Sequence, residues 1–267
     1  MQSQLFCKFG DMFLKNNKMK NRIWICSSII LGIKLMLSTG CKKDDEEPNK
    51  LVYDTITDIE GNMYKTIVIG TQTWMAENLK TTKYRNGDLI RTTTPATLDI
   101  SSESTPKYQW ASGGYEEHVE MYGRLYTWYA VTDSRNVCPN GWHVPTDTEW
   151  TILTDYLTNN DYGYQGSGND IGKSMAATSG WFLDPTAGNV GNNQASNNSS
   201  GFTALPGGYR YFRGAYLYNV FRGYWWSSTG YSTTNAFCWR MHFSYTSVIR
   251  DSSSMCEGLA VRCLKDL

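Results

Sequence analysis

Four cysteines in the C-terminal half of the chain offer the clearest covalent chemistry of the sequence. They are Cys138, Cys238, Cys256 and Cys263. In a protein exported to an oxidising compartment, four such thiols form two disulfides, and three pairings are open. The remaining cysteines, Cys7, Cys26 and Cys41, lie near the N-terminus, before, within and at the end of an apolar stretch. The cysteines therefore predict cross-links in the body of the chain without fixing which thiols pair.

A second chemically capable group is a run rich in aromatic side chains and arginine. Its members are Tyr209, Arg210, Tyr211, Phe212, Arg213, Tyr216, Tyr218, Phe221, Arg222, Tyr224, Trp225 and Trp226. Exposed aromatic rings beside arginine suit stacking on sugar rings or a protein-binding hot spot. The alternative is that the tyrosines pave a strand surface. Trp225 and Trp226 should straddle that strand, one facing inward and one outward, because neighbouring strand residues point to opposite faces.

Patterns for metal binding and catalysis are weak. The histidines are His118, His143 and His242, and none has HxxxH or CxxC spacing, which favours packed or exposed side chains over zinc ligands. No Ser/His/Asp order or paired-carboxylate motif indicates hydrolysis. We therefore predict no catalytic residue, no metal and no cofactor.

Two loop-like stretches resemble nucleotide or calcium sites only superficially. In the run 166–174, Ser167 stands where the pattern GxxxxGK[ST] requires glycine. Asp161, Asn169 and Asp170 lack the DxDxDG arrangement of a calcium loop. Both stretches are interpreted as polar loops.

Composition narrows the partners and the class of protein. Lys+Arg and Asp+Glu number 25 each, so the net charge gives no argument for nucleic acid as a partner. The chain has 267 residues, of which 40% are hydrophobic, enough to bury one good core or two smaller ones. The content of Tyr, Trp and Gly is typical of exported domains with short strands and tight turns.

The N-terminal region resembles an export signal. Met19 opens a leader with Lys20 and Arg22, an apolar run over 23–37, and small residues before Cys41. We expect residues 1–40 to be a leader, with translation starting at Met19 and a signal peptide over 19–40. Lys34 interrupts a run that is too short for a membrane span. The residues 37–41, LSTGC, resemble a bacterial lipobox, which implies that Cys41 is lipidated and anchors the chain to a membrane.

The residues directly after Cys41 are strongly charged. The stretch 42–48, KKDDEEP, cannot bury a core, so residues 41–52 are predicted to be a disordered acidic tether. Its place behind the lipid cysteine resembles the surface-export signal of lipoproteins in the Bacteroidetes. The resemblance implies an outer-membrane lipoprotein that faces the cell exterior.

Local patterns place the elements of the body. Thr146 and Glu149 have the spacing of a capping box, and the apolar residues that follow recur at helical intervals. A second helix is expected over 171–177, ending at Gly180. Residues 122–131 are a short helix or strand, and 91–118 a long loop. Strands are expected over 64–69, 74–84, 202–205, 209–212, 224–227, 236–243 and 259–264.

Several blocks, in one order, resemble the Fibrobacter succinogenes major paralogous domain, a family of exported bacterial proteins. They are DIEGN at 58–62, IVIGTQTWMAENL at 67–79, YGRLYTWYAV at 122–131, CPNGWHVPTDTEW at 138–150, GFTALPGGYR at 201–210, WWSST at 225–229 and LAVRCLKD at 259–266. The likeness covers roughly 52–266 and predicts one domain over 53–267. The family has no settled activity to carry over.

More distantly, VPTDTEW at 144–150 with a late Gly-Gly turn is similar to C-type-lectin-like and formylglycine-generating-enzyme folds. This resemblance implies an α+β scaffold with short mixed strands and two helices. Mapped by order, it also implies disulfides Cys138–Cys263 and Cys238–Cys256, the alternative being free buried thiols. Scaffold does not fix function.

In such scaffolds the ligand docks on irregular loops, here 159–170 and 213–231. Binding residues gather on loops held by a rigid scaffold, and tyrosine supplies contact area at low entropic cost. The predicted contact residues, all exposed, are Tyr216, Tyr218, Arg222 and Tyr224. Three functions stay open: a surface module that binds a glycan or a protein, which we favour; an oxidase that would hold copper through Cys238 and Cys256; and a structural or assembly role.

Overall fold

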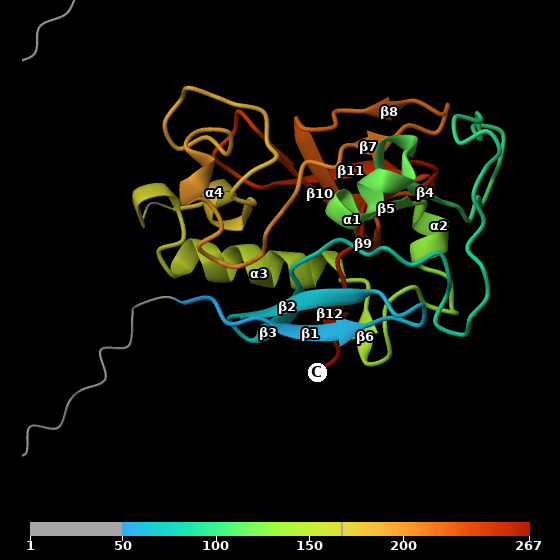
Figure 1. The fold of residues 1–267 in the computed structure, drawn as a ribbon, viewed down its shortest axis with the longest axis horizontal. Coiled ribbons are helices and arrows are strands. Elements are labelled where there is room, and N and C mark those ends of the chain that lie inside the picture. Colours follow the sequence, from blue (N-terminus) through green and yellow to red (C-terminus); the bar gives the residue numbers. More distant parts are fainter. Residues whose placement is uncertain (1–49, 167) are drawn as a thin grey trace, which may run out of the picture. The chain divides into compact units, whose positions relative to one another are not determined.

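The computed structural model describes residues 50–166 and 168–267 (Figure 1). The predicted leader over 1–40, the lipidation site Cys41 and most of the tether over 41–52 lie outside the described residues. Within the described ranges, no helix is long and apolar enough to cross a membrane.

The largest sheet joins the two ends of the domain. It has five antiparallel strands in the order β1-β2-β3-β12-β6. They are β1 (Asp54–Thr57), β2 (Met63–Ile69), β3 (Gln72–Met75), β12 (Leu264–Lys265) and β6 (Trp142–His143). The strand predicted over 64–69 is confirmed. Because β12 lies between β3 and β6, the last strand of the chain is inserted among early ones (Figure 1).

The second sheet carries the aromatic run. It has three antiparallel strands, β9 (Arg222–Gly230), β10 (Asn235–His242) and β11 (Ile249–Ser254), with β10 in the middle. Two small hairpin-like sheets pair β4 (Gln109–Ala111) with β5 (Arg124–Tyr126), and β7 (Tyr209–Arg210) with β8 (Tyr216–Leu217). Since β8 and β9 occupy much of 213–231, the expectation of an irregular loop there is wrong.

Helix α3 (Asp147–Asn159) begins where the sequence predicted. The Thr146 side chain accepts a hydrogen bond from the Glu149 backbone, and the Glu149 side chain accepts one from the Thr146 backbone, which is a capping box. The described residues contain three further α-helices of four residues each, α1 (Val119–Tyr122), α2 (Trp128–Val131) and α4 (Gly172–Met175). Short 3-10 turns lie at η1 (Ser112–Gly114), η2 (Glu116–His118), η3 (Tyr164–Gly166) and η4 (Gln194–Ser196).

The prediction of two helices is therefore wrong in number, although the α+β class holds. The expected second helix over 171–177 is shortened to α4, because Ala176 has an extended backbone and bonds toward Ala204 in a bridge. Residues 122–131 divide into strand β5 and helix α2, so both alternatives for that stretch occur within it.

Two hydrophobic clusters share the same central strands. Tyr224 and Trp226 of β9 pack in one cluster, while Trp225 between them packs in the other. Trp225 and Trp226 point to opposite faces as predicted, but the expectation that one faces outward is wrong, since their exposures are 1% and 0%. Each face of β9 is covered by its own cluster. Trp150 of α3 joins the second cluster and lies 4.8 Å from the Trp74 ring.

A buried arginine holds these elements together. Arg262 is fully buried, and its Nε donates to Asn78 Oδ1 at 3.0 Å. Its terminal nitrogens donate to the carbonyls of Phe202 and Thr203, the latter at 2.7 Å. The same Asn78 oxygen accepts a hydrogen bond from Trp225 Nε1 at 2.9 Å. Burial lowers the pKa of Arg262 to about 9, so the guanidinium stays charged at neutral pH and is compensated by neutral oxygens.

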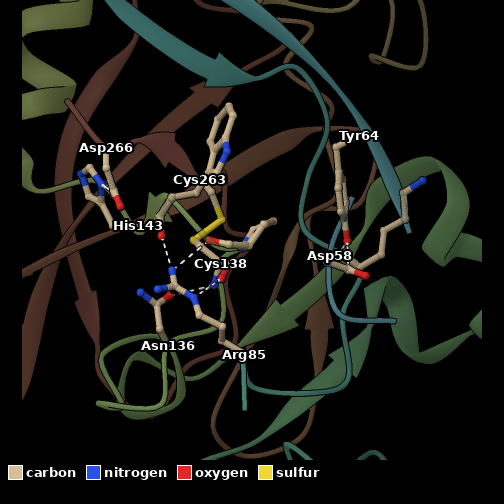
Figure 2. The surroundings of a disulfide bond; sticks show 11 residues. Asp58, Tyr64, Arg85, Asn136, Cys138, His143, Cys263 and Asp266 are labelled. Carbon is tan, nitrogen blue, oxygen red and sulfur yellow. Dashed lines mark hydrogen bonds and ion pairs between the residues drawn. A yellow bond between two sulfur atoms is a disulfide. The ribbon is translucent and has the colours of Figure 1, made fainter. Parts of the chain in front are cut away.

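The disulfide Cys138–Cys263 is present and closes a sequence separation of 125 residues. It ties the loop before β6 to the residue before β12. Figure 2 shows Arg85 beside it, reaching back to this loop. Arg85 Nε donates to the Cys138 carbonyl at 3.1 Å and Nη2 to the Pro139 carbonyl at 2.9 Å.

The second expected disulfide, Cys238–Cys256, is wrong: both thiols are free. Cys238 lies on β10 and points into the first cluster with 1% exposure. Cys256 lies in the turn after β11, half-buried, with its Sγ 3.8 Å from the Glu103 carbonyl oxygen. The two thiols thus have different surroundings, and burial raises the pKa of each.

Thiol labelling tests this arrangement. In unfolded, non-reduced protein, iodoacetamide should modify Cys238 and Cys256 completely, whereas Cys138 and Cys263 should react only after reduction. In folded protein Cys256 should react faster than Cys238, because it is the less buried thiol. Peptide mapping by mass spectrometry gives both answers. A peptide cross-linked through Cys238 and Cys256 would contradict the structure.

Candidate functional site

Three neighbouring segments bring four residues of the aromatic run together. Tyr209 comes from β7, Tyr218 from the turn between β8 and β9, and Arg222 and Tyr224 from β9. Arg222 and Tyr224 are two residues apart in a strand, so their side chains share a face of the sheet. These four residues are called the tyrosine–arginine patch.

The side chains of the patch form a closed set of contacts. The Arg222 guanidinium carbon lies 4.0 Å from the centre of the Tyr218 ring. Arg222 Nη1 donates to the Tyr224 hydroxyl at 3.1 Å. Tyr209 stacks on Tyr218 at 5.9 Å and meets Tyr224 edge-on at 5.1 Å between ring centres. Such stacking holds a guanidinium in a fixed plane without neutralising its charge.

Arg222 has no acidic partner. Among residues 50–166 and 168–267, no carboxylate forms an ion pair with it. Its Nε is shielded from solvent and meets no hydrogen-bond acceptor. By contrast, Arg240, which lies beside it on the same face, binds Asp251 Oδ2 at 2.7 Å. The positive charge of the patch therefore remains uncompensated.

The neighbouring histidine is affected by this charge. His242 is the cross-strand partner of Arg222 in the pairing of β9 with β10. Its pKa is lowered by burial and by the charges of Arg222 and Arg240, against a weaker opposing effect of Asp184. Nδ1 of His242 accepts a hydrogen bond from the Ser244 backbone at 3.2 Å. His242 is thus a neutral imidazole with its δ nitrogen as acceptor at neutral pH.

The buried phenols are hydrogen-bond donors at physiological pH. Burial, followed by the charge of Glu257, raises the pKa of Tyr209 to about 12. Burial also raises the pKa of Tyr224. Both hydroxyls therefore keep their protons, and the patch combines one cation with neutral polar groups.

The turn that presents Tyr218 has a strained backbone. Tyr218 and Val220 have φ of +60° and +63°, a region that side chains other than glycine rarely adopt. Each such residue costs on the order of 1 kcal/mol or more. The turn is fixed by hydrogen bonds from the Val220 backbone to Pro206 and from the Phe182 backbone to Val220, at 2.9 and 2.8 Å. The fold therefore holds an exposed tyrosine in one orientation.

The predicted contact residues differ in their exposure to solvent. Tyr218 is exposed, at 43%, as predicted. Arg222 is half-buried, so the prediction that it is an exposed residue is wrong. The prediction that Tyr224 is an exposed contact is wrong, because its side chain is 9% exposed and packs in the first cluster.

Tyr216 is separate from the patch. Its ring lies against Gly114, where an added Cβ would come 3.0 Å from it, and its hydroxyl faces the Ala96 carbonyl at 3.5 Å. Tyr218 lies beyond the end of β8 and has φ of +60°, so strand alternation does not apply to it, and it is exposed while Tyr216 is half-buried. The prediction that Tyr216 is an exposed contact is wrong.

Two members of the site were not selected from the sequence. Tyr209 was assigned to a strand, and strand alternation was the available signal that Tyr209 and Arg210 face opposite ways. In the structure Arg210 is the fully buried one of the two. His242 was predicted to be a packed or exposed side chain and not a zinc ligand, and no ligand contact was assigned to it. Its relation to Arg222 depends on the register of β9 with β10, which the sequence does not specify.

The other histidines are occupied by scaffold contacts. His143 bridges two carboxylates, with Nδ1 2.7 Å from Asp266 and Nε2 3.0 Å from Glu149; Figure 2 shows it beside Asp266. His118 Nδ1 lies 3.1 Å from the Ser112 carbonyl. The described part of the chain contains no group of three His, Cys, Asp or Glu residues placed to hold a metal ion.

A groove of about 750 Å³ lies elsewhere, on one face of the five-stranded sheet. Thr66 and Val68 of β2, Thr73 of β3 and Lys265 of β12 line it. Its volume suits a ligand, and the charged residues of its lining are Lys50, Asp54 and Lys265. The tyrosine–arginine patch has the more specific chemistry.

Comparison with known proteins gives one match. The sequence model of the family described as the Fibrobacter succinogenes major domain matches residues 67–265. The match extends from β2 to β12 and includes the whole patch. No curated protein and no solved structure matches the chain.

Stability measurements can separate the buried and exposed members of the patch. Tyr224→Ala should lower the free energy of unfolding by about 3 kcal/mol, because it empties part of a core. Tyr218→Ala should lower it by less than about 1 kcal/mol, because the ring is largely at the surface. Urea denaturation measures both. Equal losses for the two variants would contradict the assigned burial.

Proposed function

This chain belongs to the Fibrobacter succinogenes major domain family, and we propose that it is a ligand-binding module displayed at the cell surface. The observation that carries the proposal is the Arg222–Tyr218 stack. An exposed ring at 43% exposure and an unpaired guanidinium, 4.0 Å apart, are held by a strained turn. Strain of this kind is found at ligand sites, where the rest of the fold compensates its cost.

A glycan is the ligand class that the patch suits best. The flat C–H face of a sugar ring packs on an aromatic ring, and its hydroxyls pair with phenol and guanidinium groups. Tyr218 supplies the ring, and Arg222 with Tyr209 supplies the polar groups. A protein ligand is the competing candidate, because Phe182 and Leu183 are 49% and 76% exposed and Phe182 packs beside Phe221.

An oxidase is the less favoured alternative. A copper site of the formylglycine-generating type needs two accessible cysteines side by side. Cys238 is buried in the core and its pKa is raised by burial, which disfavours the thiolate that a metal requires. A purely structural role would not explain why an exposed Tyr218 is held in a strained backbone conformation.

We also propose a lectin-like arrangement for the scaffold. Its support is the helix α3 shortly after Cys138, the disulfide from Cys138 to Cys263 beside the last strand, and the mixture of short strands and helices. The loop 159–170 and the turn over 217–221 would then belong to the variable part of the scaffold.

The location of the module follows from the N-terminal sequence. The LSTGC motif at 37–41 and the acidic run behind it support lipidation of Cys41 and anchoring in the outer membrane, facing outward. A single acyl chain binds membranes weakly, so stable anchoring requires the several chains of a lipidated N-terminal cysteine.

A glycan array tests the binding proposal. Full-length protein should bind a defined set of glycans, and Tyr218→Ala should weaken binding at least tenfold because it removes the stacking surface. The matched control is Tyr231→Ala, which removes a tyrosine that is 60% exposed on the hairpin between β9 and β10. Equal binding by the two variants would place the site elsewhere. Binding to proteins alone would favour the competing candidate.

Membrane fractionation tests the anchor. Cys41→Ala should move the protein from the membrane fraction to the soluble fraction, because no acyl chain can be attached. Cys26→Ala, within the leader, is the control and should leave the distribution unchanged. Retention of the Cys41→Ala protein in the membrane would refute lipidation as the anchor.

A further inference from the structure

The charges in and around the patch narrow the class of ligand further. On the face shared by β9 and β10, Arg240 is paired with Asp251, whereas Arg222 has no carboxylate partner among the described residues. The nearest acid that acts on His242, Asp184, is engaged by the Thr186 backbone and the Asn189 side chain at 2.7 and 3.1 Å. Both hydrogen bonds are accepted by Oδ1 of Asp184, and among the described residues Asp184 forms no ion pair with Arg222.

The geometry of Arg222 fixes what it can bind. Stacking on Tyr218 sets the plane of the guanidinium, and the bond to the Tyr224 hydroxyl uses Nη1. Because Nε is shielded from solvent, a carboxylate would approach the two terminal nitrogens, Nη2 and the second hydrogen of Nη1, as a planar fork that an ammonium lacks. An anionic oxygen pair is thus the complementary group.

The distance between the ring and the cation favours a sugar acid over an acidic peptide. In a uronic acid the carboxylate is attached directly to the pyranose ring, so ring and charge are separated by one bond. The patch places the two groups together: the Arg222 guanidinium lies over the Tyr218 ring, 4.0 Å from its centre, and a sugar ring would pack on the part of Tyr218 that stays exposed. In Asp and Glu the carboxylate sits on a flexible aliphatic stem that offers no flat face for the tyrosine.

We infer that the tyrosine–arginine patch binds uronic-acid residues of an acidic polysaccharide, with Arg222 holding the carboxylate and Tyr218 the ring. The inference rests on the proposed glycan-binding function and adds the ligand class. His242 is a neighbour whose pKa is lowered first by burial and then by the charges of Arg222 and Arg240. Tyr209 and Tyr224 keep Tyr218 and Arg222 in place.

The test compares a carboxylate with its own neutral ester. Oligogalacturonate and the same oligomer after methyl esterification share their sugar rings but differ in charge and in the added methyl groups, and titration calorimetry with full-length protein measures both. Oligomannuronate and hyaluronan fragments extend the set of uronates. We expect at least one of these uronates to bind as the free acid. If oligogalacturonate binds, its free acid should bind at least tenfold more tightly than its methyl ester. If another uronate binds instead, reduction of its carboxyl groups should weaken its binding at least tenfold.

Variants assign the effect to the patch. Arg222→Gln should abolish the preference for the charged form, and Arg222→Lys should restore only part of it because lysine lacks the planar fork. Arg91→Gln is the matched control, since Arg91 is an exposed arginine outside the patch. Tyr218→Ala should weaken charged and neutral forms alike. The wild-type comparison needs no variant to fold.

The outcomes separate the inference from the function on which it rests. Equal affinity for charged and neutral forms, or binding of neutral glycans only, would overturn the uronate inference. If that binding still depended on Tyr218, the proposed glycan-binding function would stand. Poly-glutamate binding as tight as that of the best uronate would overturn the inference in favour of an acidic peptide. Failure of every glycan, neutral or charged, would overturn both proposals.

Discussion

The fold depends on a buried cation, Arg262, that forms no ion pair with any of the described residues. Arg262 is fully buried, stacks 4.3 Å from the Phe202 ring centre, and donates to neutral oxygens of Asn78, Met75, Phe202 and Thr203. Leaving such a group without acceptors costs several kcal/mol, so the carbonyls around it must be held in place. The loop at 202–203, the segment with Asn78 and the last strand are thereby fixed relative to one another.

The segment around Arg262 also joins the two hydrophobic clusters. Val261 and Cys263 face one cluster, and Ala260 and Leu264 face the other. Its backbone accepts hydrogen bonds from Trp226 on β9 and from Met75 on β3. Residues of the sequence blocks that identify the family therefore stabilise the scaffold. The proposed binding residues lie apart from this segment, Arg222 on β9 and Tyr218 in the turn between β8 and β9.

The sequence predicted those parts of the fold that depend on local pattern. The α3 cap follows from Thr146 and Glu149, and β2 from alternation. Strand β11 was missed because its sequence, IRDSSS, is polar and exposed, so only pairing with β10 reveals it. Trp225 and Trp226 were placed on opposite faces, but alternation does not say what covers each face.

Within the site, Tyr218 was found from composition and Tyr216 was misplaced, because the direction of each ring depends on the turn after β8. The pairing of Arg222 with His242 and the absence of an acidic partner are products of strand register and long-range packing.

Native-state hydrogen exchange tests most directly whether the Arg262 segment makes one cooperative unit of the two clusters. The amides of Met75 and Trp226, bonded to the carbonyls of Cys263 and Ala260 on either side of this segment, are the probes. The account predicts that both exchange only through global unfolding, with the same opening free energy and the same denaturant dependence. If one amide opens at a free energy lower by about 2 kcal/mol or more while the other stays protected, the clusters unfold separately and the segment does not unite them.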